Sequence, residues 1–140
     1  MIKIKKKILC IDYGYKRSGI SITDSTNKIA LGLCCIKSNN LLNFLKKIII
    51  KENIYIIVLG EPKTLNNKNQ DITIKIYEIK NKILNMFPKI RVELVDERFT
   101  SKLAEYWLYF MNIKKKNKKN KINIISSILI LQSFLKKKKI

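Results

Sequence analysis

The chain has 140 residues, the size of a single domain, and 46% of them are hydrophobic, so it can bury one core. It contains no histidine, which excludes Ser-His-Asp and Cys-His nucleophiles, histidine-ligated zinc and an imidazole base. Its formal net charge of +20 favours polyanionic partners such as nucleic acid.

Lysine supplies most of this charge, and a general compositional excess of lysine explains it as well as binding does. Arginine is the better sign of a phosphate site because its planar guanidinium pairs bidentately, and the chain has three: Arg17, Arg91 and Arg98. The longest nearly apolar run, residues 124–135, is shorter than the roughly 18 residues of a membrane span. The basic start is followed by too few apolar residues for a secretory signal. We therefore expect a cytoplasmic protein with no membrane partner.

The first half of the chain predicts three strands, a helix and a fourth strand. Apolar or alternating runs predict the strands at residues 7–12, 19–23, 28–36 and 54–59, with a turn over residues 14–19. In the third strand Ile29, Leu31 and Leu33 alternate and so share one face. Ser38 or Asn40 is expected to cap a helix. Its apolar positions are Leu41, Leu45, Ile48 and Ile49.

The second half predicts helices around one more strand. Residues 64–69 are polar and indicate a loop, and a helix is expected from Asp71 until Pro88 ends it. Its apolar positions recur at helical spacing: Ile72, Ile76, Ile79, Ile83 and Phe87. A strand is expected at 91–95, and Thr100 or Ser101 is expected to cap a helix. That helix carries Leu103, Trp107 and Phe110 on one side.

The end of the chain alternates between basic and apolar stretches. Six of the eight residues 114–121 are lysine, which predicts a solvated loop. Residues 122–135 predict a helix that is buried on nearly every face, with Ser126 and Ser127 allowing close approach to a neighbour, and residues 136–139 form a charged tail. Together the elements predict one α/β domain over residues 1–140. Its mixed sheet combines a three-strand antiparallel meander with parallel strands, and helices flank it.

The three cysteines, Cys10, Cys34 and Cys35, have no CxxC spacing and lie in apolar stretches. We expect reduced core thiols in place of a disulfide or a metal site.

Asp12 is the first residue that could carry chemistry, because it ends a strand beside a turn that contains Gly14. A carboxylate in this position either acts at a functional site or bonds the amides of the turn. Lys16 and Arg17 follow a few residues later, which suits phosphate binding as well as an ordinary salt bridge. The segment lacks the spacing of a P-loop.

Asp96 and Glu97 form a second acidic position, at the end of a strand and before an expected helix. Because neighbouring strand residues point to opposite faces, we expect only one of them to meet Asp12. The alternative role is compensation of the helix dipole. Two converging carboxylates would make an oxygen-rich site for Mg²⁺ or Mn²⁺, and metal-dependent phosphodiester hydrolysis needs such acids and no histidine.

Four motifs resemble those of the bacterial pre-16S ribosomal RNA nuclease family. They read DYGYKRSGISITD at 12–24, VLGEP at 58–62, DERFTS at 96–101 with Ala104 and Glu105, and INIISS at 122–127 with ILQSFL at 130–135. The resemblance covers nearly the whole chain. It implies a ribonuclease H-like fold related to Holliday-junction resolvases. It also implies a cytoplasmic hydrolase that cleaves phosphodiester bonds with Mg²⁺ or Mn²⁺ and matures the 5′ end of the small-subunit ribosomal RNA.

The same resemblance implies the site residues. The family's acids fall on Asp12 and Glu97, and its third acid falls on Asn123, which is an amide in this chain. These three residues are the expected catalytic and metal-binding set, and an amide can still offer a carbonyl oxygen to Mg²⁺. Lys16, Arg17 and Arg98 are expected to hold substrate phosphates. The expected partners are the ribosomal RNA precursor and the small ribosomal subunit, with the protein a monomer or a homodimer.

Two other functions stay open on the sequence. Loss of the third acid favours a catalytically weakened RNA-binding factor in ribosome assembly, whereas the shared fold allows a resolvase of branched DNA. Asp24 or Asp96 could approach the metal where the third acid is missing. The lysine-rich stretch at 114–121 would add salt-sensitive attraction to nucleic acid if it is more than a solvated loop.

Overall fold

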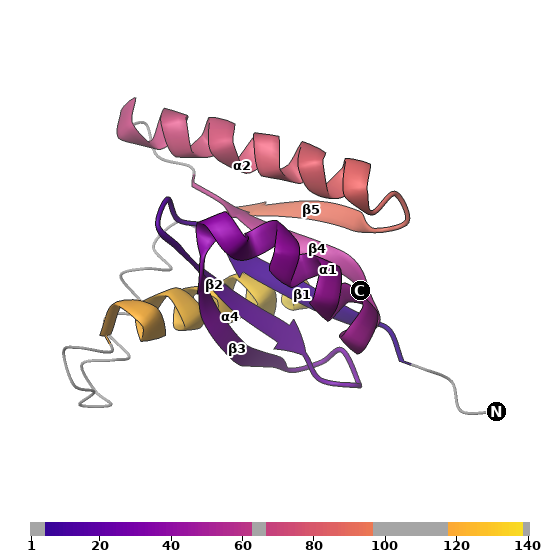
Figure 1. The fold of residues 1–140 in the computed structure, drawn as a ribbon. Helices are drawn as coiled ribbons and strands as arrows, with labels where there is room; N and C mark the ends of the chain where they lie inside the picture. The colour runs from indigo at the N-terminus through magenta and orange to yellow at the C-terminus, as the bar shows by residue number, and fades with distance from the viewer. Residues whose placement is uncertain (1–4, 63–66, 97–117, 139–140) are drawn as a thin grey trace.

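The computed structural model describes residues 5–62, 67–96 and 118–138 (Figure 1). Its sheet has five strands in the order β3-β2-β1-β4-β5. The strands are β1 (Lys7–Asp12), β2 (Arg17–Thr23), β3 (Ala30–Lys37), β4 (Ile54–Glu61) and β5 (Arg91–Asp96). Strands β1, β2 and β3 form the antiparallel meander, and β1, β4 and β5 run parallel. The predicted α/β mixed sheet is confirmed.

Three helices flank the sheet in the part of the chain that the structure describes. Helices α1 (Leu41–Glu52) and α2 (Asn67–Met86) cover one face, and α4 (Lys118–Lys138) covers the other (Figure 1). A short 3₁₀ helix, η1 (Ser38–Asn40), leads into α1, and Asn53 ends α1 in the left-handed conformation. The expected helix with Leu103, Trp107 and Phe110 lies outside the described residues.

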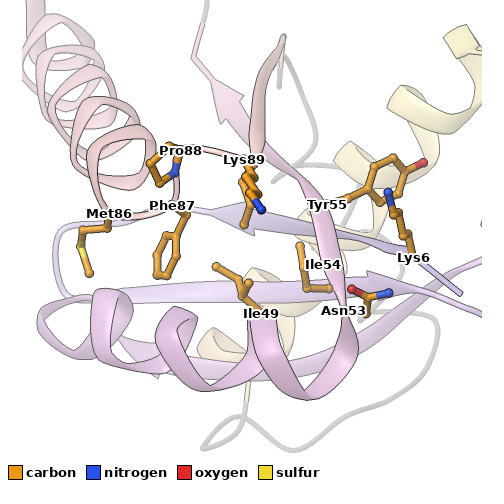
Figure 2. Close-up of a pocket in the computed structure, with 10 residues that line it drawn as sticks. Lys6, Ile49, Asn53, Ile54, Tyr55, Met86, Phe87, Pro88 and Lys89 are labelled. Atoms are coloured by element: carbon orange, nitrogen blue, oxygen red, sulfur yellow. The ribbon is translucent and has the colours of Figure 1, made fainter. Parts of the chain in front are cut away.

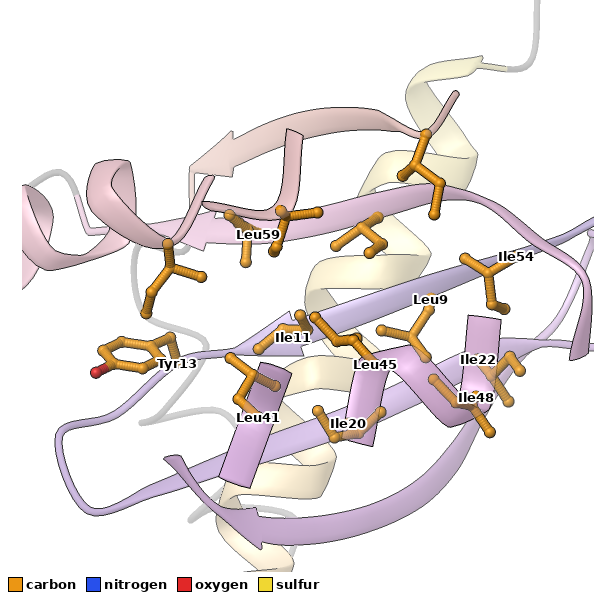
Figure 3. Packing of buried hydrophobic residues seen from close by; sticks show 14 of the residues in the cluster. Leu9, Ile11, Tyr13, Ile20, Ile22, Leu41, Leu45, Ile48, Ile54 and Leu59 are labelled. Carbon is orange, nitrogen blue, oxygen red and sulfur yellow. The ribbon is translucent and has the colours of Figure 1, made fainter. Parts of the chain in front are cut away.

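The alternation of side chains along β1 divides the core into two layers. Leu9, Ile11 and Tyr13 pack under α1 and α2, in the cluster that Figure 3 shows. Ile8 and Cys10 point the other way and pack against α4. Because the alternation continues to the end of the strand, Asp12 also lies on the α4 face of the sheet.

Helix α4 lies very close to the sheet because small residues face each other across the interface. A Cβ atom on Gly19 of β2 would overlap the backbone carbonyl of Asn123, and one on Gly32 of β3 would lie 2.7 Å from Cγ2 of Ile124. Ser126 and Ser127 of α4 are fully buried, as their expected role in close approach requires. This contact fixes Asn123 against β2.

The largest differences from the predicted boundaries lie in β2, α2 and α4. Strand β2 begins at Arg17, two residues before the expected start, and α2 begins at Asn67, inside the expected loop at 64–69. Helix α4 runs from Lys118 to Lys138, so part of the expected lysine loop and part of the tail are helical. Lysine is a good helix former, and adding a turn to a packed helix needs no new nucleation.

The predicted capping of α1 is wrong, and β3 and α4 differ in how far their side chains are buried. Ile29, Leu31 and Leu33 are 56%, 47% and 40% exposed, because β3 is an edge strand of the sheet. Within residues 122–135 of α4 only Gln132 is exposed and all other side chains are buried or half-buried, as predicted, whereas Lys121, Lys136 and Lys137 at the two ends are exposed. Neither Ser38 nor Asn40 caps α1 through its side chain. The hydroxyl of Ser38 instead bonds the turn between β1 and β2.

The cysteines are all free thiols, with Cys10 buried and Cys34 and Cys35 half-buried. Burial, and then the neighbouring Cys35, raise the pKa of the Cys34 thiol. In the described ranges, no helix is both long and apolar enough to cross a membrane.

Candidate functional site

Asp12 ends β1 on the α4 face of the sheet, where its cross-strand partner is Gly19 of β2. Side chains of directly opposed residues lie on the same face, about 4.5–5.5 Å apart at Cβ. With no side chain on Gly19, the space beside Asp12 is open to the helix above it. The backbone carbonyl of Asn123 in α4 occupies that space.

Asn123 therefore lies over Gly19, the cross-strand neighbour of Asp12, although 111 positions separate Asn123 from Asp12 in the chain. Its amide nitrogen Nδ2 donates to Sγ of Cys35 at 3.8 Å, and Cys35 is the β3 partner of the same Gly19. Donation from Nδ2 occupies the nitrogen end of the amide and leaves Oδ1 as its acceptor end. We call Asp12, Gly19, Cys35 and Asn123 the carboxyl-edge site, since β1 ends there.

The donor atoms of this site are oxygens, the atom type that a hard divalent cation prefers. A carboxylate and an amide oxygen are ligands that Mg²⁺ and Mn²⁺ accept. Within residues 5–62, 67–96 and 118–138, no group of three or more acidic, cysteine or histidine side chains could hold a metal. Two of the three expected ligands, Asp12 and Asn123, thus both adjoin Gly19 on the α4 face of the sheet. Glu97, like Arg98, lies outside the described residues.

Neither of the substitute acids considered from the sequence lies at the carboxyl-edge site. Asp96 is the last residue of β5 and pairs in register with Glu61 of β4. The preceding residue, Val95, packs on the α4 face of the sheet. Because successive strand residues point to opposite faces, Asp96 lies on the face opposite Asp12. Asp24 lies in the turn after β2, at the other edge of the sheet. There it accepts bonds from the Thr26 hydroxyl and from the amides of Lys28 and Ile29.

Two of the three expected phosphate-binding cations lie in the described residues, a few positions after Asp12. Lys16 and Arg17 are exposed and lie at the start of β2, and Arg17 Nη1 donates to Oδ1 of Asn120 in α4 at 2.6 Å. This bond ties the start of β2 to the start of α4. Sequence reasoning missed Asn120, because nothing in the local pattern links two polar residues that are 103 positions apart.

Ser38 is a second residue whose role the sequence did not predict: it holds the turn between β1 and β2. Its amide donates to the carbonyl of Lys16 at 2.9 Å, and its hydroxyl bonds the carbonyl of Gly14 and shares a 2.7 Å bond with Ser18. A Cβ on Gly14 would come within 2.6 Å of the Arg17 carbonyl, so the turn is tight. Ser38 and Gly14 together fix the turn that carries Tyr15 and Lys16.

Tyrosines line the same sheet edge on its α2 side. Tyr77 of α2 donates its hydroxyl to Oε1 of Glu61 at the end of β4, and this bond raises the pKa of Tyr77. Burial raises the pKa of Tyr13, with Tyr15 and Glu78 adding to the effect. Glu61 belongs to one of the motifs noted above. In the structure it holds a tyrosine on the face opposite Asp12.

A cavity of about 540 Å³ lies at the other end of the sheet (Figure 2). It opens where β1, β4 and β5 begin, between the ends of α1 and α2. The side chains around it are mostly apolar, with Lys6 and Lys89 at its margin and no carboxylate. It is therefore a separate feature that cannot supply acidic ligands to a metal.

Comparison with known proteins shows which family the chain belongs to. The family model described as "RuvX: Holliday junction resolvase" matches residues 6–137. A protein of Phocaeicola vulgatus named "Putative pre-16S rRNA nuclease" is 42% identical over 135 residues, which cover 95% of this chain and 97% of the relative. Relatives of the same name in Flavobacterium psychrophilum and Karelsulcia muelleri are each 41% identical, over 94% and 93% of this chain and 98% of each relative. The chain therefore belongs to the RuvX family.

Proposed function

We propose that the chain is a metal-dependent nuclease that hydrolyses phosphodiester bonds in the precursor of 16S ribosomal RNA, at its 5′ end. The observation that carries this proposal is the convergence of Asp12 and Asn123 on the two sides of Gly19. The printed names of relatives that are about 40% identical over nearly their whole length support the reaction class and the substrate.

Asp12 and Asn123 would hold Mg²⁺ or Mn²⁺ through carboxylate and amide oxygens, with Glu97 as the third ligand implied by its motif. A divalent ion at such a site supplies charge neutralisation at the phosphate and activation of the attacking water. Cys35 has a positioning role in this arrangement. By accepting the bond from Nδ2 of Asn123, it leaves Oδ1 of the amide available to the ion.

The surrounding cations would bind the phosphates on either side of the cleaved bond. Lys16 and Arg17 are exposed beside Asp12, and Arg98 is the third candidate from the sequence. Helix α4 begins at Lys118 with no acidic residue in its first turn, so the positive end of its dipole adds to the lysine charge near Arg17. Affinity for RNA should accordingly fall steeply as salt rises.

The proposed partner is a ribosomal RNA precursor, free or on the small ribosomal subunit, in the cytoplasm. The chain would act as a monomer or a homodimer.

Two alternatives follow from particular observations. Asn123 provides no charge where the family pattern has an acid, which favours a weakly catalytic RNA-binding factor in ribosome assembly, because metal affinity depends on ligand charge. The printed description of the matching family model favours a resolvase of branched DNA.

One cleavage experiment separates the three functions. A precursor RNA mimic and a four-way DNA junction are each incubated with Mg²⁺ or Mn²⁺ and with wild type, Asp12→Asn or Asn123→Asp. We expect wild type to cut the RNA and Asp12→Asn to lose this activity by at least about 100-fold, since a ligand charge is removed. Cutting of the junction alone would establish the resolvase. If Asn123→Asp cuts the RNA and wild type does not, the chain is the weakly catalytic assembly factor.

A further inference from the structure

Tyr15 lies at the tip of the turn between β1 and β2, three residues after Asp12, and is 57% exposed. Within the described residues no hydrogen bond or ion pair holds its side chain, and more than half of the residue is exposed to solvent. Its neighbour Tyr13, by contrast, is buried in the core under α1 and α2. Packing therefore accounts for Tyr13 and leaves the position of Tyr15 unexplained.

The turn holds Tyr15 in a defined place. Ser38 bonds the backbone on both sides of it, at the carbonyls of Gly14 and Lys16, and the close approach of Gly14 to the Arg17 carbonyl keeps the turn tight. A ring on a fixed backbone loses less conformational entropy on binding than one on a free loop. Tyr15 is thus presented as a preorganised surface.

The chemistry around Tyr15 matches a nucleotide. Lys16 and Arg17 are exposed directly after it and can bind phosphate, and Asp12 lies directly before the turn. Tyr77 offers a second exposed ring on the same sheet edge, 42% exposed, with Lys80 Nζ 6.0 Å from its centroid. An aromatic ring between cations is the combination that binds single-stranded nucleic acid.

We propose that Tyr15 is a stacking platform for an unpaired nucleobase next to the cleaved phosphodiester bond. The proposal rests on the proposed nuclease function and specifies its substrate as single-stranded at the cut site. A paired base is already stacked on both sides and cannot reach the ring, whereas an unpaired base presents a free face. Lys16 and Arg17 hold the phosphates of that strand.

Binding without metal tests the proposal, since no cleavage occurs in EDTA. A fluorescein-labelled unpaired RNA 12-mer and an RNA duplex of the same sequence are titrated with wild type, Tyr15→Ala and Tyr15→Phe. Loss of one stacked base weakens binding by about tenfold. We expect this loss for Tyr15→Ala with the unpaired RNA only. Tyr15→Phe should bind like wild type, because it keeps the ring.

Lys16→Gln is the matched control, because it changes the adjacent residue by removing a charge. It should weaken binding to both RNAs and lower the dependence of log affinity on log salt by about one, whereas Tyr15→Ala should leave that slope unchanged. Melting temperatures of all variants verify the fold. Equal losses for duplex and unpaired RNA in Tyr15→Ala, or a loss in Tyr15→Phe as large as in Tyr15→Ala, would overturn the proposal.

A DNA 12-mer of the same sequence separates base from ribose. Stacking predicts the same loss on DNA, because it uses the face of the base, and a loss confined to RNA would contradict it. The binding result is independent of cleavage. If wild type cuts no RNA but its preference for unpaired strands depends on Tyr15, the nuclease function is wrong and the stacking platform stands. If wild type cuts RNA but Tyr15→Ala binds unpaired RNA as wild type does, the nuclease function stands and the stacking platform is wrong.

Discussion

The residue that most affects the chemistry of this chain is Asn123. The sequence alone placed it in the metal-binding set by family resemblance. The structure adds that its backbone contacts Gly19, the partner of Asp12, and that its amide nitrogen is bound by Cys35. An amide held in one orientation can act as a neutral oxygen ligand. In the proposed function, Cys35 therefore has the role of positioning this amide.

Asp24 is the acid whose role the structure changes most. The sequence left it as a possible metal ligand, but its carboxylate is bonded by Thr26 and the following backbone amides, at the opposite sheet edge. The Thr26 hydroxyl, followed by these amides, holds the pKa of Asp24 below its ordinary value. Asp24 thus stabilises the turn between β2 and β3.

This lowered pKa predicts a pH-dependent contribution to folding. A group with a depressed folded pKa stabilises the protein above its unfolded pKa, about 3.9 for Asp, and loses this effect as the pH falls through the folded value. Wild type should have a higher urea midpoint than Asp24→Asn near neutral pH, and the difference should vanish in acid. Asp71→Asn, on the exposed surface of α2, controls for loss of a charge. A difference that grows in acid would contradict the assignment.

Among the elements, the type and approximate position of the strands and α-helices were largely predictable, and their ends were not. Apolar runs, alternation and helical spacing identify every described strand and α-helix, but not the short 3₁₀ helix η1. Helix α4 nevertheless begins four residues before the expected start, because lysines can extend a helix that is already packed. The exposure of Ile29, Leu31 and Leu33 was also missed, since a strand pattern does not reveal whether the strand lies at the sheet edge.

The contact between α4 and the sheet predicts a large effect at Gly19. A Cβ there would overlap the Asn123 carbonyl and lie 2.8 Å from the Ile124 nitrogen, and these backbone atoms can move only with the helix. Gly19→Ala should lower the free energy of unfolding by about 1–3 kcal/mol, measured by urea denaturation, and reduce RNA cleavage.

Gly32→Ala is its control, because the atoms nearest to the new Cβ belong to the side chains of Ile124 and Ile128, which can rotate. It should have the smaller effect on both stability and cleavage. Equal effects of the two substitutions would mean that α4 can shift freely over the sheet, and that Asn123 is not held against β2.

At the scale of the whole molecule, the site depends on contacts between distant segments. Asp12 and Asn123 both adjoin Gly19 only because β1 pairs with β2 and α4 packs on the same face. Their residue types could be read from the motifs, but their shared contact with Gly19 could not. The bond between Arg17 and Asn120 was equally beyond the sequence, as was the fixing of the Tyr15 turn by Ser38.

The central claim is that Asp12 and Asn123 form one metal-binding site at the carboxyl edge of β1. The most direct test is paramagnetic broadening of amide signals by substoichiometric Mn²⁺ in ¹⁵N-labelled protein. We predict broadening centred on Asp12, Gly19, Cys35 and Asn123, with the signals of Asp24 and Ile29 at the opposite edge unaffected, and loss of the effect in Asp12→Asn. Broadening centred on Asp24, or broadening unchanged in Asp12→Asn, would contradict the account.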